Sequence, residues 1–535
     1  MTINVQEMPV GTIFTSEKDG SPDIDHYWFI LDENAEKLSA RQGMYCYTKS
    51  EAGIIIGLIQ SITVRNQYYE QPHTVKNLDS GSFSGLSSYF PSDRWEDYIG
   101  LVRVLGTFPI SKSSSIETLK PGFYKKVQRS SFPAKPGGKV FILSGPELES
   151  FLGLDPSGLH LGTLDNYDID VNLNINRLIN KHLAVLAMSG AGKSYLVSDM
   201  IEELLLRDDS MGTPGVLLID VHGEYKFFSD ATLPENKKFA AKTRYYDGKY
   251  FEIGVPRLSA YDFARYQPNI SNPQIRELKK VLADLSNDSE PVEITDNGKE
   301  SQGSSNTGYD INDIIDRLNS AVQMNQKVRD ALVGWLYELD RYNLFSKAEN
   351  PRPEQLIKPG NLTILDLSNV ISVKKKRIIV SFLAEKLFFY RRIGKIPPFF
   401  MILEEAHQFA PEGVVGSAKI TKPIIETIAR EGRKFFAQLC LISQRPVKLS
   451  TTALSQCNTH IILRVTNPND LDHIKTSSEA LTRESLRMIS TLPTGNALIM
   501  GSAVNMPLFF KARRRYSSNP KDDDTLEDIC KRYVS

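Results

Sequence analysis

The pattern of apolar and polar positions divides the chain into two parts near residue 165. Residues 1–165 predict short strands at 26–31, 54–64, 98–104 and 139–143, because brief apolar runs end at segments rich in Gly, Pro and Ser. Many short strands of this kind are typical of a small barrel or sandwich. The segment carries no catalytic constellation, so we predict a docking or assembly domain.

Beyond residue 165 the pattern changes to that of a parallel α/β sheet. Residues 183–188 form a continuous apolar run, as expected of a strand buried on both faces. Apolar residues at helical spacing follow as far as Leu205, and a second buried strand spans 216–220, which together predict a βαβ unit. Further strands are expected at 362–367, 399–403, 437–442, 459–465, 497–500 and 508–510, with helices at 377–392 and 421–430.

A helical insertion is predicted within this sheet. About 140 residues separate Asp220 from the strand at 362–367, whereas one crossover needs only about 30. We expect the insertion at 256–350, with Asn272 as a helix N-cap. Its helices are expected at 273–285, 311–323 and 326–344, with a flexible loop near 287–306 that is too polar to bury itself. The core would then comprise 166–255 and 351–515, and a tail would follow at 516–535, polar and flexible at 517–524 with short helical turns at 526–534.

Composition limits the classes of function. The 535 residues include 64 Lys and Arg and 64 Asp and Glu, so the formal net charge is zero. Bulk charge therefore cannot hold the chain to nucleic acid or membrane, and a polyanion would need a local basic patch. The densest basic runs are 374–377 and 513–515, which either line a channel or form solvated faces. No apolar stretch approaches the ~20 residues that a bilayer requires, so we expect a cytoplasmic protein. The four cysteines are scattered and indicate neither disulfides nor zinc.

A phosphate-binding loop is predicted at 187–194. The segment AMSGAGKS fits the pattern GxxxxGK[ST] except that Ala187 replaces the first glycine. Backbone N–H groups and the start of the following helix would surround a phosphate. Lys193 would reach the β- and γ-phosphates, and the Ser194 hydroxyl would ligate Mg²⁺. An ordinary glycine turn is the alternative. The candidate ATP-binding residues are Ser189, Gly190, Ala191, Gly192, Lys193, Ser194 and Tyr195.

Two acidic motifs follow buried strands, at the carboxyl edge where open α/β sheets bind ligands. Glu404 and Glu405 end the run FFMILEE; Glu404 would hold Mg²⁺ through water, and Glu405 would polarise the attacking water. Asp220 and Glu224, within IDVHGEY, can supply further carboxylates. The alternative for these acids is a solvated strand end.

Histidine and amide side chains accompany the acids. His222 and His407 have no second ligand at metal spacing, so hydrogen bonding or packing is the better interpretation of each. Gln444 follows the strand at 437–442, where it can sense the γ-phosphate or orient water. Arg430 and Arg433 can neutralise charge on the nucleotide of a neighbouring subunit, as arginine fingers do, or be solvated like most surface arginines.

Four segments together resemble the HerA family of hexameric ATPases, relatives of FtsK. They are AMSGAGKS at 187–194, DVHGEY at 220–225, ILEEAHQF at 402–409, and AREGRKF at 429–435 with SQRP at 443–446. The resemblance covers about residues 160–515 and implies an α/β fold: a RecA-like P-loop NTPase core, an N-terminal β-barrel like the HAS-barrel, and an appended helical bundle. We expect a bacterial member.

The resemblance also implies partners. It implies a homohexamer that binds ATP and Mg²⁺ at subunit boundaries, drives double-stranded DNA through its channel and works with a nuclease or sirtuin-like NADase docked at the barrel. The role would be DNA end processing or anti-phage defence. Two other functions stay open. One is a nucleotide-controlled scaffold with little translocation; the other is a secretion motor like the VirB relatives, against which the lack of membrane segments weighs.

One position departs from the family pattern. Members often carry an arginine just before the phosphate-loop strand as a finger acting on the neighbouring subunit, and Lys181 stands there in this chain. Lysine cannot make the bidentate contact of arginine. The resemblance therefore implies that the residue acting on the neighbouring subunit is Lys181 itself, Arg177, Arg430 or Arg433.

Overall fold

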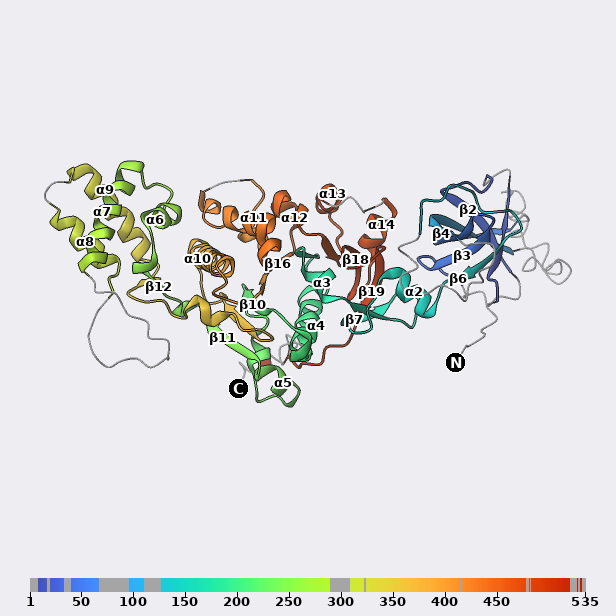
Figure 1. Ribbon diagram of the computed structural model, residues 1–535, viewed down its shortest axis with the longest axis horizontal. Coiled ribbons are helices and arrows are strands. Elements are labelled where there is room, and N and C mark those ends of the chain that lie inside the picture. The colour runs from blue at the N-terminus through green and yellow to red at the C-terminus, as the bar shows by residue number, and fades with distance from the viewer. Residues whose placement is uncertain are drawn as a thin grey trace. The chain divides into compact units, whose positions relative to one another are not determined.

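The computed structural model describes residues 8–16, 20–32, 40–66, 96–109, 127–288, 308–321, 324–413, 416–477, 481, 483–519, 527, 530 and 531 (Figure 1). The chain divides into two compact units. The first contains 1–158, 162–172 and 504–511, and the second contains 159–161, 173–503 and 512–535. Most of the predicted loop near 287–306 and most of the predicted turns at 526–534 lie outside the described residues.

The first unit contains a closed antiparallel barrel with the strand order β1-β2-β5-β4-β3-β6. The strands are β1 Gly11–Phe14, β2 His26–Leu31, β3 Tyr45–Ser50, β4 Gly53–Asn66, β5 Glu96–Phe108 and β6 Lys139–Ile142. Tyr27, Phe29, Ile55 and Val102 fill its core and are fully buried. The predicted N-terminal barrel is therefore confirmed, and the sandwich alternative is wrong. Sequence reasoning missed β1 and β3.

The same unit also contains α2 (Gly145–Leu152) and parts of three strands in the order β19-β7-β8. These strands are β7 Leu159–Leu164, β8 Asp170–Leu173 and β19 Leu508–Ala512. The Tyr45 hydroxyl donates to the Pro507 carbonyl at 2.9 Å, so residues near the end of the chain pack beside its beginning. The sequence pattern predicted a strand at 508–510 but assigned it to the core, and it missed β7 and β8.

The second unit is built on a mostly parallel sheet with the order β11-β14-β10-β15-β16-β9-β17-β18. The strands are β9 Leu183–Leu186, β10 Gly215–Asp220, β11 Thr243–Asp247, β14 Leu362–Asp366, β15 Phe399–Leu403, β16 Ala437–Ser443, β17 Thr459–Ile462 and β18 Asn496–Gly501. Strands β9, β10, β14, β15, β16 and β17 are buried at every residue, which explains their uninterrupted apolar runs. The predicted parallel α/β core is confirmed, although β18 runs antiparallel to β17.

Helices join these strands. The main ones are α3 Ile175–Ile179, α4 Lys193–Leu206, α5 Lys237–Ala240, α10 Val373–Arg392, α11 Lys422–Glu431, α12 Thr451–Ser455, α13 Pro468–Ser477 and α14 Arg483–Thr491. The predicted start of α10 at residue 377 is wrong. The helix begins at Val373, and the basic residues of its first turn interrupt the apolar pattern from which the start was predicted. The Ser372 hydroxyl caps the helix by accepting from the Lys375 N–H.

The predicted helical insertion is confirmed as α7 Asn272–Asp288, α8 Ile311–Ser320 and α9 Gln326–Asp340. The helix α6 (Ala260–Tyr266) was not predicted, and α9 ends at Asp340 instead of the predicted residue 344. In Figure 1 these helices gather into one group, coloured green to yellow. The short parallel strands β12 (Ile253–Gly254) and β13 (Phe345–Ser346) flank them in the sequence. Asn272 is not the N-cap of α7 but lies within it, and Gln274 accepts hydrogen bonds from the Ser271 N–H and hydroxyl before it.

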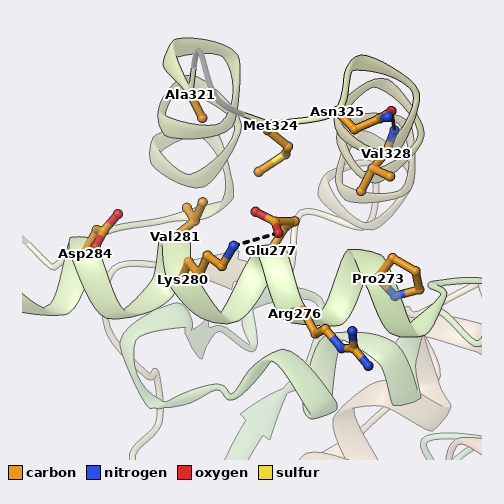
Figure 2. Close-up of a pocket in the computed structure, with 10 residues that line it drawn as sticks. All are labelled: Pro273, Arg276, Glu277, Lys280, Val281, Asp284, Ala321, Met324, Asn325 and Val328. Atoms are coloured by element: carbon orange, nitrogen blue, oxygen red, sulfur yellow. Dashed lines mark hydrogen bonds and ion pairs between the residues drawn. The ribbon is translucent and has the colours of Figure 1, made fainter.

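A hollow of about 540 Å³ lies between α7 and the segment that joins α8 to α9 (Figure 2). Its charged lining residues are of both signs: Arg276, Lys280, Glu277 and Asp284. Lys280 pairs with Glu277 at 2.8 Å. Because the charges are mixed, the hollow favours neither an anion nor a cation, and we assign it no function.

The segment after β19 is held against α4. The Arg513 side chain is 5% exposed, and its guanidinium lies 2.9 Å from Glu202 and 3.1 Å from Glu203. The Ser517 N–H donates to Glu202 at 2.7 Å, and the Ser518 N–H donates to the Asn236 side chain at 2.8 Å. The expectation of a flexible tail is therefore wrong at Ser517 and Ser518, while 520–526 lie outside the described residues.

Candidate nucleotide site

The predicted phosphate loop joins β9 to α4. Gly190 and Gly192 have φ angles of 74° and 96°, a region that side chains rarely adopt, which explains why glycine stands at both positions. Ala187 is fully buried, and its N–H donates to the Ser443 carbonyl at 3.3 Å. The alanine that replaces the first glycine is thus accommodated, while Ser189 and Gly190 are exposed at the turn.

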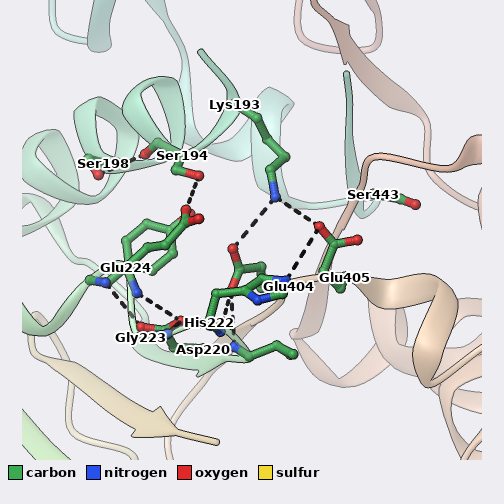
Figure 3. Close-up of polar contacts among 12 residues, drawn as sticks. Lys193, Ser194, Ser198, Asp220, His222, Gly223, Glu224, Glu404, Glu405 and Ser443 are labelled. Atoms are coloured by element: carbon green, nitrogen blue, oxygen red, sulfur yellow. Dashed lines mark hydrogen bonds and ion pairs between the residues drawn. The ribbon is translucent and has the colours of Figure 1, made fainter. Parts of the chain in front are cut away.

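Lys193 joins the loop to the acidic pair (Figure 3). Its Nζ lies 3.3 Å from Glu405 Oε1 and 3.5 Å from Glu404 Oε1. All three side chains are at most 5% exposed. Parallel pairing of β15 and β16, and of β16 and β9, brings the carboxyl ends of these strands to one edge. Residues about 210 positions apart thereby meet, as the motif reasoning predicted.

Asp220 holds the turn that follows β10. Its carboxylate accepts hydrogen bonds from the backbone N–H groups of His222, Gly223, Glu224 and Tyr225, at 3.1, 2.7, 3.2 and 3.0 Å. Gly223 has a φ of 73°. The turn directs Glu224 toward the loop, where the Ser194 hydroxyl donates to the Glu224 carboxylate (Figure 3). In this structure Asp220 therefore binds backbone, and Glu224 is the acid that reaches Ser194.

Asp220→Asn should disorder this turn. An amide offers one acceptor oxygen in place of two, so at least one buried N–H loses its partner, at a cost of about 1–3 kcal/mol. We expect a lower melting temperature in calorimetry, together with faster proteolysis near residues 220–225. Asp208→Asn is the matched control, because Asp208 accepts from the Ser210 N–H at an exposed turn. Equal melting temperatures of Asp220→Asn and the wild type would contradict this role.

Burial sets the protonation of the inner acids. Burial and, to a smaller extent, the neighbouring Asp220 carboxylate raise the pKa of Glu404 to about 8. Burial also raises the pKa of Asp220. Glu404 Oε2 accepts from the Val221 N–H at 2.9 Å, which ties the end of β15 to the turn after β10.

Glu405 has a different environment. Burial would raise the pKa of its carboxyl, but the hydrogen bond from His407 and the charge of Lys193 outweigh burial and lower the pKa to about 2. His407 Nδ1 lies 3.2 Å from Glu405 Oε2 and 3.2 Å from the Ser443 hydroxyl. Glu405 itself has a φ of 48°, an uncommon backbone conformation for this residue type. The carboxylate is thus ionised and held from two sides. The hydrogen-bonding interpretation of His407 agrees with this geometry.

Comparisons with known proteins agree with the fold and the motifs. The family model described as "Helicase HerA, central domain" matches residues 159–387. The DNA double-strand break repair helicase HerA of Pyrococcus furiosus is 29% identical over 91% of this chain and 90% of its own length. The chain is thus similar to HerA helicases over most of its length. A probable helicase of Methanocaldococcus jannaschii is 28% identical over 92% of this chain and 89% of its own length.

The fold of this chain is also similar to that of VirB4 of Thermoanaerobacter pseudethanolicus. The TM-score is 0.50, with 16% identity over 69% of this chain and 99% of that one. At this identity the likeness concerns the fold alone. The predicted P-loop ATPase class and fold are confirmed, while the expectation of a bacterial source stays a prediction. No helix among the described ranges is both long and apolar enough to cross a membrane.

The resemblance to HerA suggested several cations as fingers for the nucleotide of a neighbouring subunit. These residues lie at the edge of the sheet opposite the phosphate loop. Lys181 precedes β9 and Arg433 precedes β16, whereas Lys193 and Gln444 follow the same strands. At ~3.3 Å per residue, β9 alone separates the two edges by about 13 Å. Gln444 is half-buried at the carboxyl end of β16. A cation that precedes these strands is therefore directed away from the phosphate loop of its own chain.

The remaining candidate residues differ in exposure and in the contacts of their side chains. Arg430 is half-exposed and lies 4.0 Å from Glu426, and Arg433 is exposed. Arg177 donates to the Ser502 carbonyl at 2.9 Å, which holds its guanidinium within the chain. Tyr195, a candidate ATP-binding residue, accepts a hydrogen bond from the Arg515 N–H at 2.7 Å.

Several side chains of the two densest basic runs pair with groups of the same chain. Arg513 is buried among acids, as described above. Lys374 donates to the Gln267 and Glu338 side chains at 2.9 and 3.1 Å, and Arg377 donates to the Gln408 carbonyl at 2.8 Å. Neither run is a continuous free basic surface.

Sequence reasoning gave no role to two residues, Ser443 at the site and His182 at the opposite edge of the sheet. Ser443 accepts the hydrogen bond of the Arg445 N–H at 3.0 Å and contacts His407, and its place directly before Gln444 was the available signal. His182, discussed below, gave no signal beyond its place after Lys181.

Proposed function

We propose that this chain is an ATP-hydrolysing, ring-forming translocase or helicase of double-stranded DNA that works as a cytoplasmic homohexamer. The observation that carries the proposal is the contact of Lys193 with both Glu404 and Glu405 at the end of a glycine loop. A cation at a loop of this kind, opposite two acids, fits triphosphate binding and in-line displacement by water. The HerA relatives named above agree with an action on DNA.

In the proposed mechanism Lys193 moves from the two acids to the β- and γ-phosphates of ATP. The ionised Glu405 polarises a water molecule, whose oxygen attacks the γ-phosphorus while the bond to the β–γ bridging oxygen breaks. The acid keeps its charge because His407 remains 3.2 Å away when Lys193 leaves. Gln444, at the end of the adjacent strand, orients the water or senses the γ-phosphate.

The side chains present fit Mg²⁺ only together with a nucleotide. Among the described residues, no three His, Cys, Asp or Glu side chains are placed to hold a metal on their own. Ser194, Glu224 and Glu404 supply the oxygen donors that Mg²⁺ prefers, and Mg²⁺ commonly takes its remaining ligands from phosphates and water. We propose Ser194 as a direct ligand and Glu404 as one acting through water. Bound there, the ion would neutralise charge on the transferred phosphoryl group.

The ring and its partners complete the proposal. Because the candidate finger residues lie at the edge opposite the loop, a second copy must supply the cation that meets the γ-phosphate. We propose that the N-terminal barrel docks an effector, either a nuclease or a sirtuin-like NADase, in DNA end processing or anti-phage defence. Co-purification of an untagged partner with the full chain, and its loss when the barrel is removed from the bait, tests this assignment.

One observation favours a second candidate function. The two densest basic runs bind within the chain, so a channel lined by basic residues must draw on other positions. An ATP-binding hexameric scaffold, which assembles an effector with little net translocation, needs no such lining.

DNA-stimulated hydrolysis separates the two functions. For the translocase, duplex DNA should raise the ATPase rate of the full chain at low salt. The apparent DNA affinity should fall steeply as the salt concentration rises, because the release of counterions from DNA then becomes less favourable. A rate that duplex DNA leaves unchanged at low salt would favour the scaffold.

A further inference from the structure

His182 occupies an unusual position at the start of the phosphate-loop strand. It is 2% exposed, and its φ is 61°, a conformation that costs a residue with a side chain about 1 kcal/mol. The Lys181 carbonyl just before it accepts from the Asn458 N–H at 2.9 Å. The chain therefore bends sharply between Lys181 and β9, and the imidazole enters the interior.

The imidazole touches two segments of the amino edge. Nδ1 accepts from the Leu439 N–H of β16 at 2.9 Å. A side chain at Gly432 would meet the His182 ring at 3.3 Å and collide with the Ala437 carbonyl, so the helix end packs directly on the imidazole. Burial lowers the pKa of His182 to about 4, so the ring is neutral near pH 7 and Nδ1 remains an acceptor.

These contacts adjoin the candidate fingers. Lys181 is next to His182, Arg433 is next to Gly432, and Arg430 lies two residues before Gly432. One neutral ring thus packs beside the backbone that carries the three cations. Lys181 and Arg433 precede β9 and β16, at the edge of the sheet opposite the phosphate loop of their own chain.

We propose that His182 is a positioning residue: it holds the cation that completes the nucleotide site of the neighbouring subunit. The inference rests on the proposed ring-forming ATPase. His182 touches no nucleotide itself. Its effect passes through Lys181 and through the junction of α11 with β16, and a displacement of about 1 Å at such a junction can cost ~10²-fold in rate.

Mixed rings provide the test. His182→Ala should bind ATP with wild-type affinity, because its own loop is intact, and should lose about 10²-fold in hydrolysis. Lys193→Ala should also be inactive, but it keeps its finger residues. When the two chains are co-expressed with different tags and purified as mixed rings, a quarter of the interfaces pair an intact loop with an intact finger. Hydrolysis should then return to about a quarter of the wild-type rate, since ring contacts are head-to-tail.

Two variants sharpen the experiment. His460→Ala is the control, because His460 is equally buried and burial lowers its pKa to about 4 as well, but it lies on β17 near Leu454; it should keep wild-type turnover. His182→Asn retains an acceptor for the Leu439 N–H and should recover part of the rate. If His182→Ala does not fold, His182→Asn replaces it in the mixed rings.

The outcomes are distinct. Mixed rings that stay as inactive as either variant alone, or a His182→Ala ring as active as His460→Ala, overturn the positioning role while wild-type hydrolysis upholds the proposed function. Weakened ATP binding by folded His182→Ala also overturns it, because the residue would then act on its own loop. A wild-type chain without ATPase activity overturns the proposed function and this inference together.

Discussion

Glu405→Gln should bind ATP with nearly wild-type affinity and lose about 10²–10⁴-fold in turnover, the range attributed to one general acid or base. The amide has the size of the carboxylate and can still accept from His407. It lacks the negative charge that polarises water, which His407 and Lys193 stabilise at this position against the effect of burial. The variant should therefore accumulate as an ATP-bound ring.

Equilibrium binding of labelled ATP and a phosphate-release assay measure the two properties separately. Glu412→Gln is a suitable control, since this glutamate accepts from the Thr451 N–H and hydroxyl away from Lys193. Undiminished turnover in Glu405→Gln would remove Glu405 from its proposed role, and lost ATP binding would show that its contact with Lys193 is structural.

Lys193→Ala should lower the affinity for ATP by about 10²-fold, the value of a hydrogen bond to a charged group together with lost charge pairing. A second effect follows from the geometry. The substitution leaves the buried, ionised Glu405 with His407 but without the Lys193 cation, and a buried charge that loses a partner destabilises a protein. We therefore expect a lower melting temperature in the absence of nucleotide.

Titration calorimetry with an ATP analogue measures the affinity, and a thermal melt measures the stability. Lys386→Ala is the matched control. Lys386 is a partly buried lysine of α10 that lies outside the site and donates to the Arg257 carbonyl. Wild-type affinity in Lys193→Ala would show that the loop does not hold the triphosphate.

The sequence predicted the nucleotide edge well because that edge depends on local patterns. Uninterrupted apolar runs identify strands that are buried on both faces, and the residues directly after them, Lys193, Glu404 and Gln444, must then share one edge. Tertiary contacts decided what the patterns left open. Asp220 resembles Glu404 in sequence context, yet its oxygens bind four backbone N–H groups.

Other features are invisible to local patterns for physical reasons. The strands β7 and β19 are far apart in the chain and pair only after folding. The basic residue Arg513 belongs to the densest charge run of the C-terminal part, but three acids on α4 compensate it. His182 has no motif of its own, since its importance lies in a positive φ and in contacts with segments about 250 residues away. Domain limits based on composition likewise cannot anticipate that 504–511 belongs with the N-terminal unit.

Movement along duplex DNA is the most direct test of the account. The full-length chain, with ATP and Mg²⁺, would be offered a linear duplex that carries a short third strand, and release of that strand would be followed over time. We predict release by the wild type and none by Glu405→Gln. A wild-type protein that hydrolyses ATP in the presence of the duplex but never displaces the third strand would contradict the translocase and favour the scaffold.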